Sequence, residues 1–331
     1  YASFQVAVKE RTTAEVPVAY LLSGGIDSTA VTAMAAKRQS DPLHTFSVVF
    51  EESTFDESGP AAAAARHIGS VHREVPFPHT ELSRLVDALT QTLCEPLADN
   101  SYLGMSLLSE AVREAGFPVA LSGDGADEHF GGYPTYLAHR GANPASRGKA
   151  LLGRLAKRLP VSTDNLSQGY KARRFTEGLG LPLHRRNQVW LGAFLPRELP
   201  ALLGREIDPW STVDRWGERC ASLSSPVQQA MYMDQRLYLG EGVLAKVDRA
   251  SMAHSLEVRS PFLHHDLVAL AARMPPSAHV SGTRTKCVLR QAFRELLPPE
   301  LIQRPKKGFG TPLGPWLAGP CSGLLDGLED R

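Results

Sequence analysis

The sequence predicts an α/β fold in which an open, mainly parallel β-sheet is flanked by helices, with an additional α-helical portion. Two observations lead to this prediction. Over about the first 130 residues, short apolar segments rich in β-branched side chains alternate with helical patterns of roughly 10–15 residues, which is typical of βαβ units. Two of the apolar segments are also followed by a Gly-rich loop with aspartates, as expected where parallel strands end at a ligand site.

Four strands are predicted in this first part, at residues 16–22, 43–50, 71–77 and 118–121. The segments between them have helical patterns, at residues 29–37, 60–68, 81–93 and 101–115. Strands separated by helices of this length pair in parallel, because each helix returns the chain to the same end of the sheet. We therefore expect an α/β nucleotide-binding core over about residues 15–140.

The remainder, about residues 141–331, is predicted to be mainly helical and to complete the site. Residues 141–215 are rich in Arg, Leu and Pro without a clear strand, which indicates short helices joined by loops. Residues 226–250 have the pattern of one long helix, and 285–297 carry apolar residues at near-helical spacing. A basic, Gly-bearing loop follows at 304–310.

Charge and cysteine usage exclude several classes of protein. The net charge is +1, from 36 basic and 35 acidic side chains, so neither nucleic acid nor an anionic membrane is expected as a partner. No apolar run reaches the ~20 residues that a membrane-spanning helix needs. The cysteines form no CxxC pair, which disfavours a zinc site and predicts reduced thiols in a cytoplasmic protein. They are Cys94, Cys220, Cys287 and Cys321.

The loop after the first predicted strand has the composition of a phosphate-binding site. It reads Ser23-Gly24-Gly25-Ile26-Asp27-Ser28 and leads into a predicted helix. Glycines let backbone N–H groups approach an anion, and the N-terminus of a helix favours negative charge. Ser23 and Ser28 can donate hydroxyl hydrogen bonds, whereas Asp27 would repel a phosphate unless Mg²⁺ lay between them. The loop matches neither the Walker A nor the GxGxxG pattern, and a simple connecting turn is the alternative interpretation.

A second acidic loop follows the fourth predicted strand, with Asp124 and Asp127 in the stretch Ser122-Gly123-Asp124-Gly125-Ala126-Asp127-Glu128. Ligands of open α/β sheets lie beyond the carboxyl ends of the strands, so this loop and the first one can converge on one Mg²⁺-bound phosphate ligand. Asp27 and Asp127 are therefore the predicted metal ligands. A solvated acidic turn is the alternative.

These segments resemble a known family. Residues 21–28 resemble the pyrophosphate-binding loop of the ATP pyrophosphatase group, and residues 122–133 are similar to the corresponding loop of the asparagine synthetase family's synthetase domain. Residues 247–263 and 304–313 are similar to two further segments of that family, in the same order along the chain. The resemblance implies a fold like that of the adenine nucleotide alpha hydrolases.

The chain departs from the family's pattern at three positions. Asp124 stands where asparagine synthetases usually have a glutamate, His129 replaces a usual leucine, and His264 replaces a common aspartate.

The resemblance implies a ligase that uses ATP and Mg²⁺ in two steps. A carboxylate, with the side chain of aspartate favoured, attacks the α-phosphate and releases pyrophosphate, and ammonia then displaces AMP to give the amide. Lys286, Asp124 and Asp127 are the implied catalytic residues. The implied nucleotide-binding residues are Leu22, Ser23, Gly24, Gly25, Asp27, Ser28, Val48, Ser122, Gly123 and Lys307.

Two alternatives remain open. The chain can be a related synthetase or cyclase that activates a peptide or natural-product carboxylate, of the lasso-peptide or β-lactam type, or a non-catalytic nucleotide-binding module. The first cysteine is Cys94, so we expect no N-terminal glutaminase domain with a cysteine nucleophile in this chain. Ammonia would then come from a glutaminase domain or partner chain, or be used directly, and the resemblance also allows a homodimer. Asp248, Arg249, Glu257 and Arg259 are expected to form an internal salt-bridge framework under the site.

Overall fold

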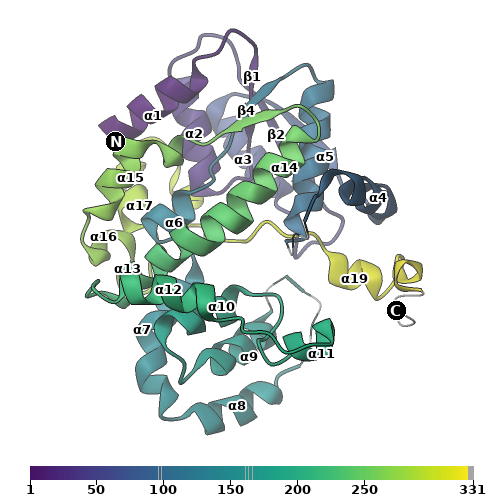
Figure 1. The fold of residues 1–331 in the computed structure, drawn as a ribbon. Coiled ribbons are helices and arrows are strands. Elements are labelled where there is room, and N and C mark those ends of the chain that lie inside the picture. The colour runs from purple at the N-terminus through teal and green to yellow at the C-terminus, as the bar shows by residue number, and fades with distance from the viewer. Residues whose placement is uncertain (96, 98, 161, 163, 166, 327–331) are drawn as a thin grey trace. The chain divides into compact units, whose positions relative to one another are not determined.

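The computed structural model describes residues 1–331 except 96, 98, 161, 163, 166 and 327–331. The chain contains a five-stranded parallel sheet with the strand order β3-β2-β1-β4-β5. Figure 1 labels strands β1, β2 and β4 of this sheet. Its strands are β1 Val18–Leu21, β2 His44–Val49, β3 Val71–Pro76, β4 Val119–Leu121 and β5 Glu257–Arg259. The predicted α/β fold with a parallel sheet is confirmed.

The four predicted strands all form, with ends within about two residues of the predicted ones. The fifth strand, β5, was not predicted, because it comes from a segment assigned to the helical portion. It has only three residues, and charged Glu257 and Arg259 flank a single apolar Val258. Pairing with β4, with Val119 opposite Glu257, makes this segment a strand, so its structure depends on a neighbour distant in sequence.

Three helices cover one face of the sheet: α4 (Leu82–Thr92), α5 (Ser101–Glu114) and α14 (Ala245–Met252). Their apolar side chains form one buried cluster with Ala19, Phe46, Val48 and Ala120 of the strands. Because these helices pack on the strands, the sheet is buried on this face and can hold in place the loops at the carboxyl ends of its strands.

The other face is covered by α2 (Ile26–Ala36) and α3 (Ser58–Ile68), which confirms the helices predicted at 29–37 and 60–68. Ala64 and Ala65 of α3 pack on Leu22, the residue after β1. An N-terminal helix that was not predicted, α1 (Ala2–Thr12), packs beside α2. The Phe4 ring of α1 lies 4.9 Å from the rings of Phe262 and Phe293.

The chain divides into two compact units, which we describe separately. The first comprises Tyr1–Ala126, Glu241–Arg273 and Val288–Arg331, and the second comprises Asp127–Gly240 and Met274–Cys287. The whole sheet belongs to the first unit. The sequence predicts a boundary near residue 140 instead. The division differs from it because α14, β5 and the C-terminal segments pack with the N-terminal part.

The described residues of the second unit are helical, apart from loops and turns. Its helices are α7 Pro134–Ser146, α8 Lys149–Lys157, α9 Gln168–Gly178, α10 Leu183–Leu191, α11 Leu199–Leu203, α12 Ser211–Cys220, α13 Pro226–Met233 and α16 Pro276–His279. A short helix, α6 (Ala126–Phe130), lies where the first unit passes into the second. The short helices predicted over 141–215 are confirmed for the described residues, while 161, 163 and 166 lie outside them.

The predicted helix over 226–250 is helical throughout, as α13, a π-helical segment η2 (Asp234–Leu244) and α14, although the π-helical part was not predicted. The helix predicted at 285–297 is shorter than expected, since α17 covers only Cys287–Ala292. The remaining elements are α15 His265–Ala272, α18 Pro299–Gln303, α19 Leu313–Leu317 and the 3₁₀ turns η1 His79–Glu81, η3 Pro261–Leu263 and η4 Ser322–Leu325. Among the helices of the described residues, none combines the length and the apolarity that crossing a membrane requires.

Candidate active site

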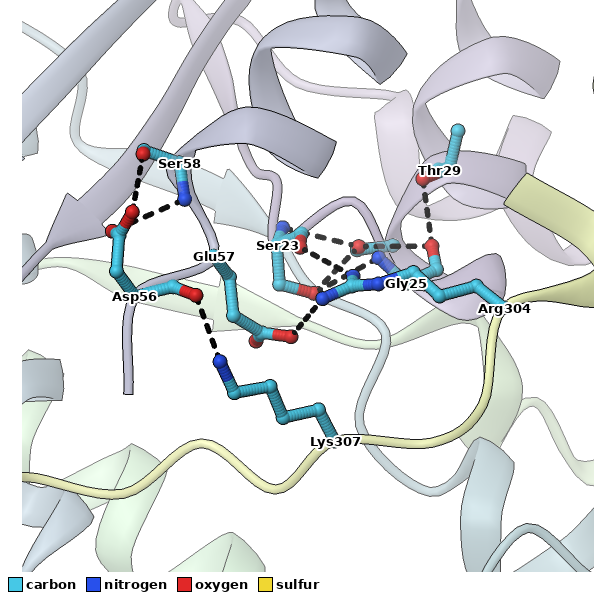
Figure 2. Close-up of polar contacts among 9 residues, drawn as sticks. Ser23, Gly25, Thr29, Asp56, Glu57, Ser58, Arg304 and Lys307 are labelled. Atoms are coloured by element: carbon cyan, nitrogen blue, oxygen red, sulfur yellow. Dashed lines mark hydrogen bonds and ion pairs between the residues drawn. The ribbon is translucent and has the colours of Figure 1, made fainter. Parts of the chain in front are cut away.

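The loop between β1 and α2 is held by hydroxyl groups. The Ser28 hydroxyl accepts a hydrogen bond from the backbone N–H of Ser23 at 3.2 Å and lies 3.1 Å from the Ser23 hydroxyl. The Gly25 carbonyl accepts a bond from the Thr29 hydroxyl at 2.6 Å (Figure 2). Gly25 precedes the first residue of α2, so the free N–H groups of this helix begin in the loop. Groups arranged in this way at a helix N-terminus can bind an anion.

Glycine is required at two positions around this loop. Gly24 has φ +69°, and a Cβ there would lie 2.4 Å from the Pro60 carbonyl carbon at the start of α3. A Cβ on Gly123 would lie 2.8 Å from the Ser28 nitrogen and 3.0 Å from the Asp27 Cβ. The loop after β4 therefore packs directly on the first turn of α2. A side chain at Gly123 would push that loop away from α2, and one at Gly24 would clash with the start of α3.

This contact lies where the strand order reverses. The chain runs from β1 towards β3 on one side and from β4 towards β5 on the other, so the loops after β1 and β4 flank the switch point at which open α/β sheets bind ligands. The hydroxyl of Ser122, the residue after β4, is buried and makes no hydrogen bond within the described part of the chain. A buried polar atom of this kind is suited to a ligand oxygen.

Cations from the C-terminal segment reach the same loop. Arg304 donates to the Ser23 carbonyl at 3.4 Å and to the Glu57 carboxylate at 2.6 Å, and Lys307 donates to the Asp56 carbonyl at 2.8 Å (Figure 2). Burial raises the pKa of Glu57, and the positive charge of Arg304 partly offsets this effect. Arg304 thus contacts the loop itself, whereas Lys307 contacts the connection between β2 and α3.

The second unit holds a buried ion pair between two of the predicted catalytic residues. The Lys286 ammonium lies 2.5 Å from a carboxylate oxygen of Asp127, and the side chains are 3% and 11% exposed. Gly132 makes the pair possible, because a Cβ there would lie 1.8 Å from that Asp127 oxygen and 2.3 Å from Lys286 Cε. Lys286 itself has φ +53°, a left-handed backbone conformation that is costly for a lysine.

Lys286 directly precedes α17, although the predicted helix over 285–297 included it, and its N–H donates to the Gly131 carbonyl at 3.3 Å. Its unusual backbone conformation and its burial are both explained if the ammonium must be held at one fixed place. Sequence patterns give no sign of either property, whereas the two adjacent glycines after Phe130 were a visible signal of close packing.

A set of buried acids and tyrosines lies beside this pair. The Tyr133 hydroxyl donates to Glu128 at 2.5 Å, and Asn187 donates to Asp234 at 2.6 Å. Burial, and next the negative charge of Asp127, raise the pKa of Glu128 to about 7. Burial also raises the pKa of Asp234 to about 7. Sequence reasoning did not single out Glu128 or Asp234 as functional.

The structure distributes the predicted site residues over the two units. In the first unit, Leu22 and Val48 are buried beside the sheet edge, and the Asp124 carbonyl accepts a hydrogen bond from Ser260. The residues predicted around the phosphate loop lie in that unit, namely Leu22, Ser23, Gly24, Gly25, Asp27, Ser28, Val48, Ser122, Gly123, Asp124 and Lys307. Asp127 and Lys286 belong to the second unit, where they contact each other.

The predicted internal salt-bridge framework is wrong. Asp248 and Glu257 are exposed, so they are not buried under a site. Arg259 pairs with Glu257 at 2.7 Å, whereas Arg249 pairs with Glu95. Glu257 and Arg259 lie on one side of β5, two residues apart, and Asp248 and Arg249 lie on α14, so the charges of this segment do not form a buried network.

Mg²⁺ binds proteins through one or two carboxylates and takes its other ligands from water and phosphate oxygens. Asp27, in the first turn of α2 beside the phosphate loop, is a donor of this kind, so the residues present fit the ion. Asp127 already has Lys286 as a counter-ion. Over the described residues, no group of three or more His, Cys, Asp and Glu side chains converges as a metal site.

Comparison with known proteins agrees with this geometry. The family model described as asparagine synthase matches residues 1–329. The chain belongs to the asparagine synthase family. The resemblance to this family seen in segments 21–28, 122–133, 247–263 and 304–313 is confirmed.

Three curated proteins illustrate which known sequences the chain is similar to. A Mycobacterium bovis protein, whose name assigns it provisionally to the glutamine-hydrolyzing asparagine synthetases, is 31% identical to the chain. The match covers 96% of the chain and 48% of that protein. The chain is 28% identical over 92% of its length to 48% of asparagine synthetase 1 of Bacillus subtilis, which is also named as glutamine-hydrolyzing. It is 28% identical over 98% of its length to 54% of a Gibberella zeae protein named amidase chry2. The chain thus spans about half the length of these curated relatives.

Proposed function

We propose that this chain is an ATP-dependent synthetase that activates a carboxylate as its adenylate and then forms an amide. The observation that carries the proposal is the loop of Ser23 to Ser28, which presents helix N–H groups and hydroxyls at the switch point of a parallel sheet. Membership of the asparagine synthase family supports the reaction type.

In the first step, a carboxylate oxygen of the substrate attacks the α-phosphorus of ATP. The bond between the α-phosphorus and the bridging oxygen breaks, and pyrophosphate leaves with the bonding electrons. The role proposed for Ser23, Ser28 and the N–H groups of α2 is to hold the leaving pyrophosphate. Preorganised donors of this kind are the main source of catalysis in phosphoryl and nucleotidyl transfer.

In the second step, the nitrogen of ammonia attacks the acyl carbon, the carbon–oxygen bond to AMP breaks, and the nitrogen loses a proton. Lys286 is proposed to neutralise phosphate charge, and Asp127 holds it in place beforehand. Mg²⁺ would supply charge neutralisation of the phosphates, with Asp27 and Asp127 as the proposed carboxylate ligands. Asp124 is proposed to face the reacting groups in place of the family's glutamate.

Aspartate and ammonia are the proposed substrates, with ammonia delivered by a glutaminase domain or a partner chain. A different carboxylate is the second candidate. The similarity to amidase chry2 favours it, because the chain is 28% identical both to that protein and to asparagine synthetase 1 of Bacillus subtilis.

The test is formation of AMP and pyrophosphate from ATP and Mg²⁺ by the full chain. Aspartate is supplied first with ammonium. Aspartate and a panel of other acids are then supplied with hydroxylamine, which traps acyl-adenylates as hydroxamates. We expect equal amounts of AMP, pyrophosphate and hydroxamate with at least one acid. Binding of ATP without turnover of any acid would contradict the proposal, and hydroxamate from another acid but not from aspartate would select the second candidate.

A further inference from the structure

The connection between β2 and α3 holds a buried carboxylate, Glu57, against the C-terminal segment. Glu57 and Arg304 form an ion pair at 2.6 Å, and their side chains are only 12% and 19% exposed. The other terminal nitrogen of the same guanidinium donates to the Ser23 carbonyl at 3.4 Å. One planar cation therefore bridges Glu57 and the first residue of the phosphate loop, as Figure 2 shows.

Glu57 is itself held by a rigid turn. The carboxylate of Asp56 accepts hydrogen bonds from the Ser58 hydroxyl at 2.6 Å, from the Ser58 N–H at 3.2 Å and from the Phe50 N–H at 3.4 Å. These bonds tie the end of β2 to the start of α3 and fix the backbone from which Glu57 projects. The Asp56 carbonyl also accepts the bond from the Lys307 ammonium, so two cations of one segment are tied to this turn.

Arg304 is the cation that pairs with Glu57, and its position next to Ser23 suits it to a second ligand. A guanidinium carries five N–H donors, more than its bonds to the Glu57 carboxylate and the Ser23 carbonyl require. The nucleotide's phosphates are proposed to bind beside Ser23, and a guanidinium suits phosphate oxygens because its donors form a planar fork.

We propose that Glu57 is a positioning residue that holds the Arg304 guanidinium at the phosphate loop, where it binds the β- and γ-phosphates of ATP and the released pyrophosphate. The inference rests on the proposed function, because it takes the loop as the nucleotide site. Orienting the arginine before the ligand arrives removes the cost of ordering a long flexible side chain on binding. The side chain of Glu57 makes no contact with the nucleotide in this proposal.

The test compares Glu57→Gln with Glu52→Gln in the full chain. Glu52 lies in the same connection but bonds to the Trp316 indole N–H, so the control makes the same chemical change away from Arg304. Dissociation constants are measured by calorimetry for MgATP, for inorganic pyrophosphate with Mg²⁺ and for AMP. We expect E57Q to weaken binding of ATP and pyrophosphate about tenfold while AMP changes less than about twofold, and we expect E52Q to resemble the wild type.

Arg304→Met supplies an independent arm, since it should show the same pattern, and adding E57Q to it should cause no further loss. Unchanged pyrophosphate binding in E57Q, or an equal loss for AMP, would overturn the positioning role. If E57Q does not fold, Glu57→Asp, which keeps the charge but draws it back by one methylene group, makes the same comparison of pyrophosphate with AMP, and unchanged pyrophosphate binding would again overturn the positioning role. A wild-type chain that binds neither ATP nor pyrophosphate would overturn the proposed function itself, which separates the two failures.

Discussion

The phosphate loop of the first unit and the Asp127–Lys286 pair of the second are built on opposite physical principles. The loop uses backbone groups and hydroxyls, with the Ser23 and Ser28 side chains 3.1 Å apart, and needs little buried charge to keep its shape. The pair consists of two charges that are almost completely buried, held by a glycine and a left-handed lysine.

The difference predicts how each region fails. Removing a hydrogen-bonding group costs little stability where water can take its place, whereas leaving a buried charge without its counter-ion costs much more. Substitutions in the loop should therefore change ligand affinity more than stability. Substitutions in the pair should change both.

The largest effect is expected for Lys286→Met, which leaves the Asp127 carboxylate buried without its counter-ion. Breaking such a pair costs about 3–5 kcal/mol of unfolding free energy, and losing a preorganised cation lowers a rate by about 10²–10³-fold. Urea unfolding and hydroxamate formation measure the two losses.

The double variant Asp127→Asn with Lys286→Met is the control for this coupling. Because it removes both charges, its loss of stability should be smaller than the sum of the two single losses. Additive losses would show that the two side chains do not stabilise each other in the folded protein.

The next effect concerns pH and Asp234. Burial raises the pKa of this carboxyl to about 7 from an ordinary value near 4, so between these values the folded protein keeps a proton that the unfolded chain has released. The unfolded state binds fewer protons in this window, so the contribution of Asp234 to stability falls as pH rises from about 4 to 7. Asp234→Asn has no such titration and should gain about 2–4 kcal/mol relative to the wild type between pH 4 and pH 8.

Urea unfolding of the wild type and of D234N across this pH range measures the difference between their free energies of unfolding. Other groups titrate in both proteins, so their contributions cancel in this difference. Asp208→Asn, at an exposed aspartate of the same unit, is the matched control and should follow the wild type. A difference between the wild type and D234N that does not change with pH would contradict the assignment.

A third effect is expected for Gly132→Ala, which tests whether the pair needs this close approach. The added methyl group would overlap Asp127 and Lys286, so one of them must move. Overpacking of this kind costs about 1–3 kcal/mol, and displacement of the ammonium should slow adenylation about tenfold or more.

Gly141→Ala is the control for that substitution, because nothing lies within 4 Å of the position where its Cβ would be. This variant should keep wild-type activity and gain up to about 1 kcal/mol of stability, because alanine is favoured over glycine inside a helix such as α7. Equal behaviour of G132A and G141A would mean that the glycine is not required by the pair.

The sequence predicted the loop region far better than the pair. Local patterns suffice for β1, β2 and the Gly-rich loops, since periodicity and turn chemistry act over a few residues. They do not suffice for β5, whose three residues become a strand only through β4. The partner of Lys286 and its φ of +53° depend on residues about 160 positions away, and no local pattern records such a contact. The buried state of Asp234 was missed for the same reason.

The smallest effect is expected in the loop, for Ser28→Ala. The hydroxyl bonds to Ser23 and lies at the start of α2, so its loss should cost only about 1 kcal/mol of stability but weaken MgATP about tenfold. Ser109→Ala is the matched control, because its buried hydroxyl donates to the Met105 carbonyl at 2.7 Å within α5 of the same unit. Calorimetry should show unchanged ATP affinity in S109A despite a similar loss of stability. If S28A lost as much stability as K286M, or bound ATP as tightly as S109A, the loop would depend on its side chains as a structural framework rather than as ligands, and the contrast between the two regions would not hold.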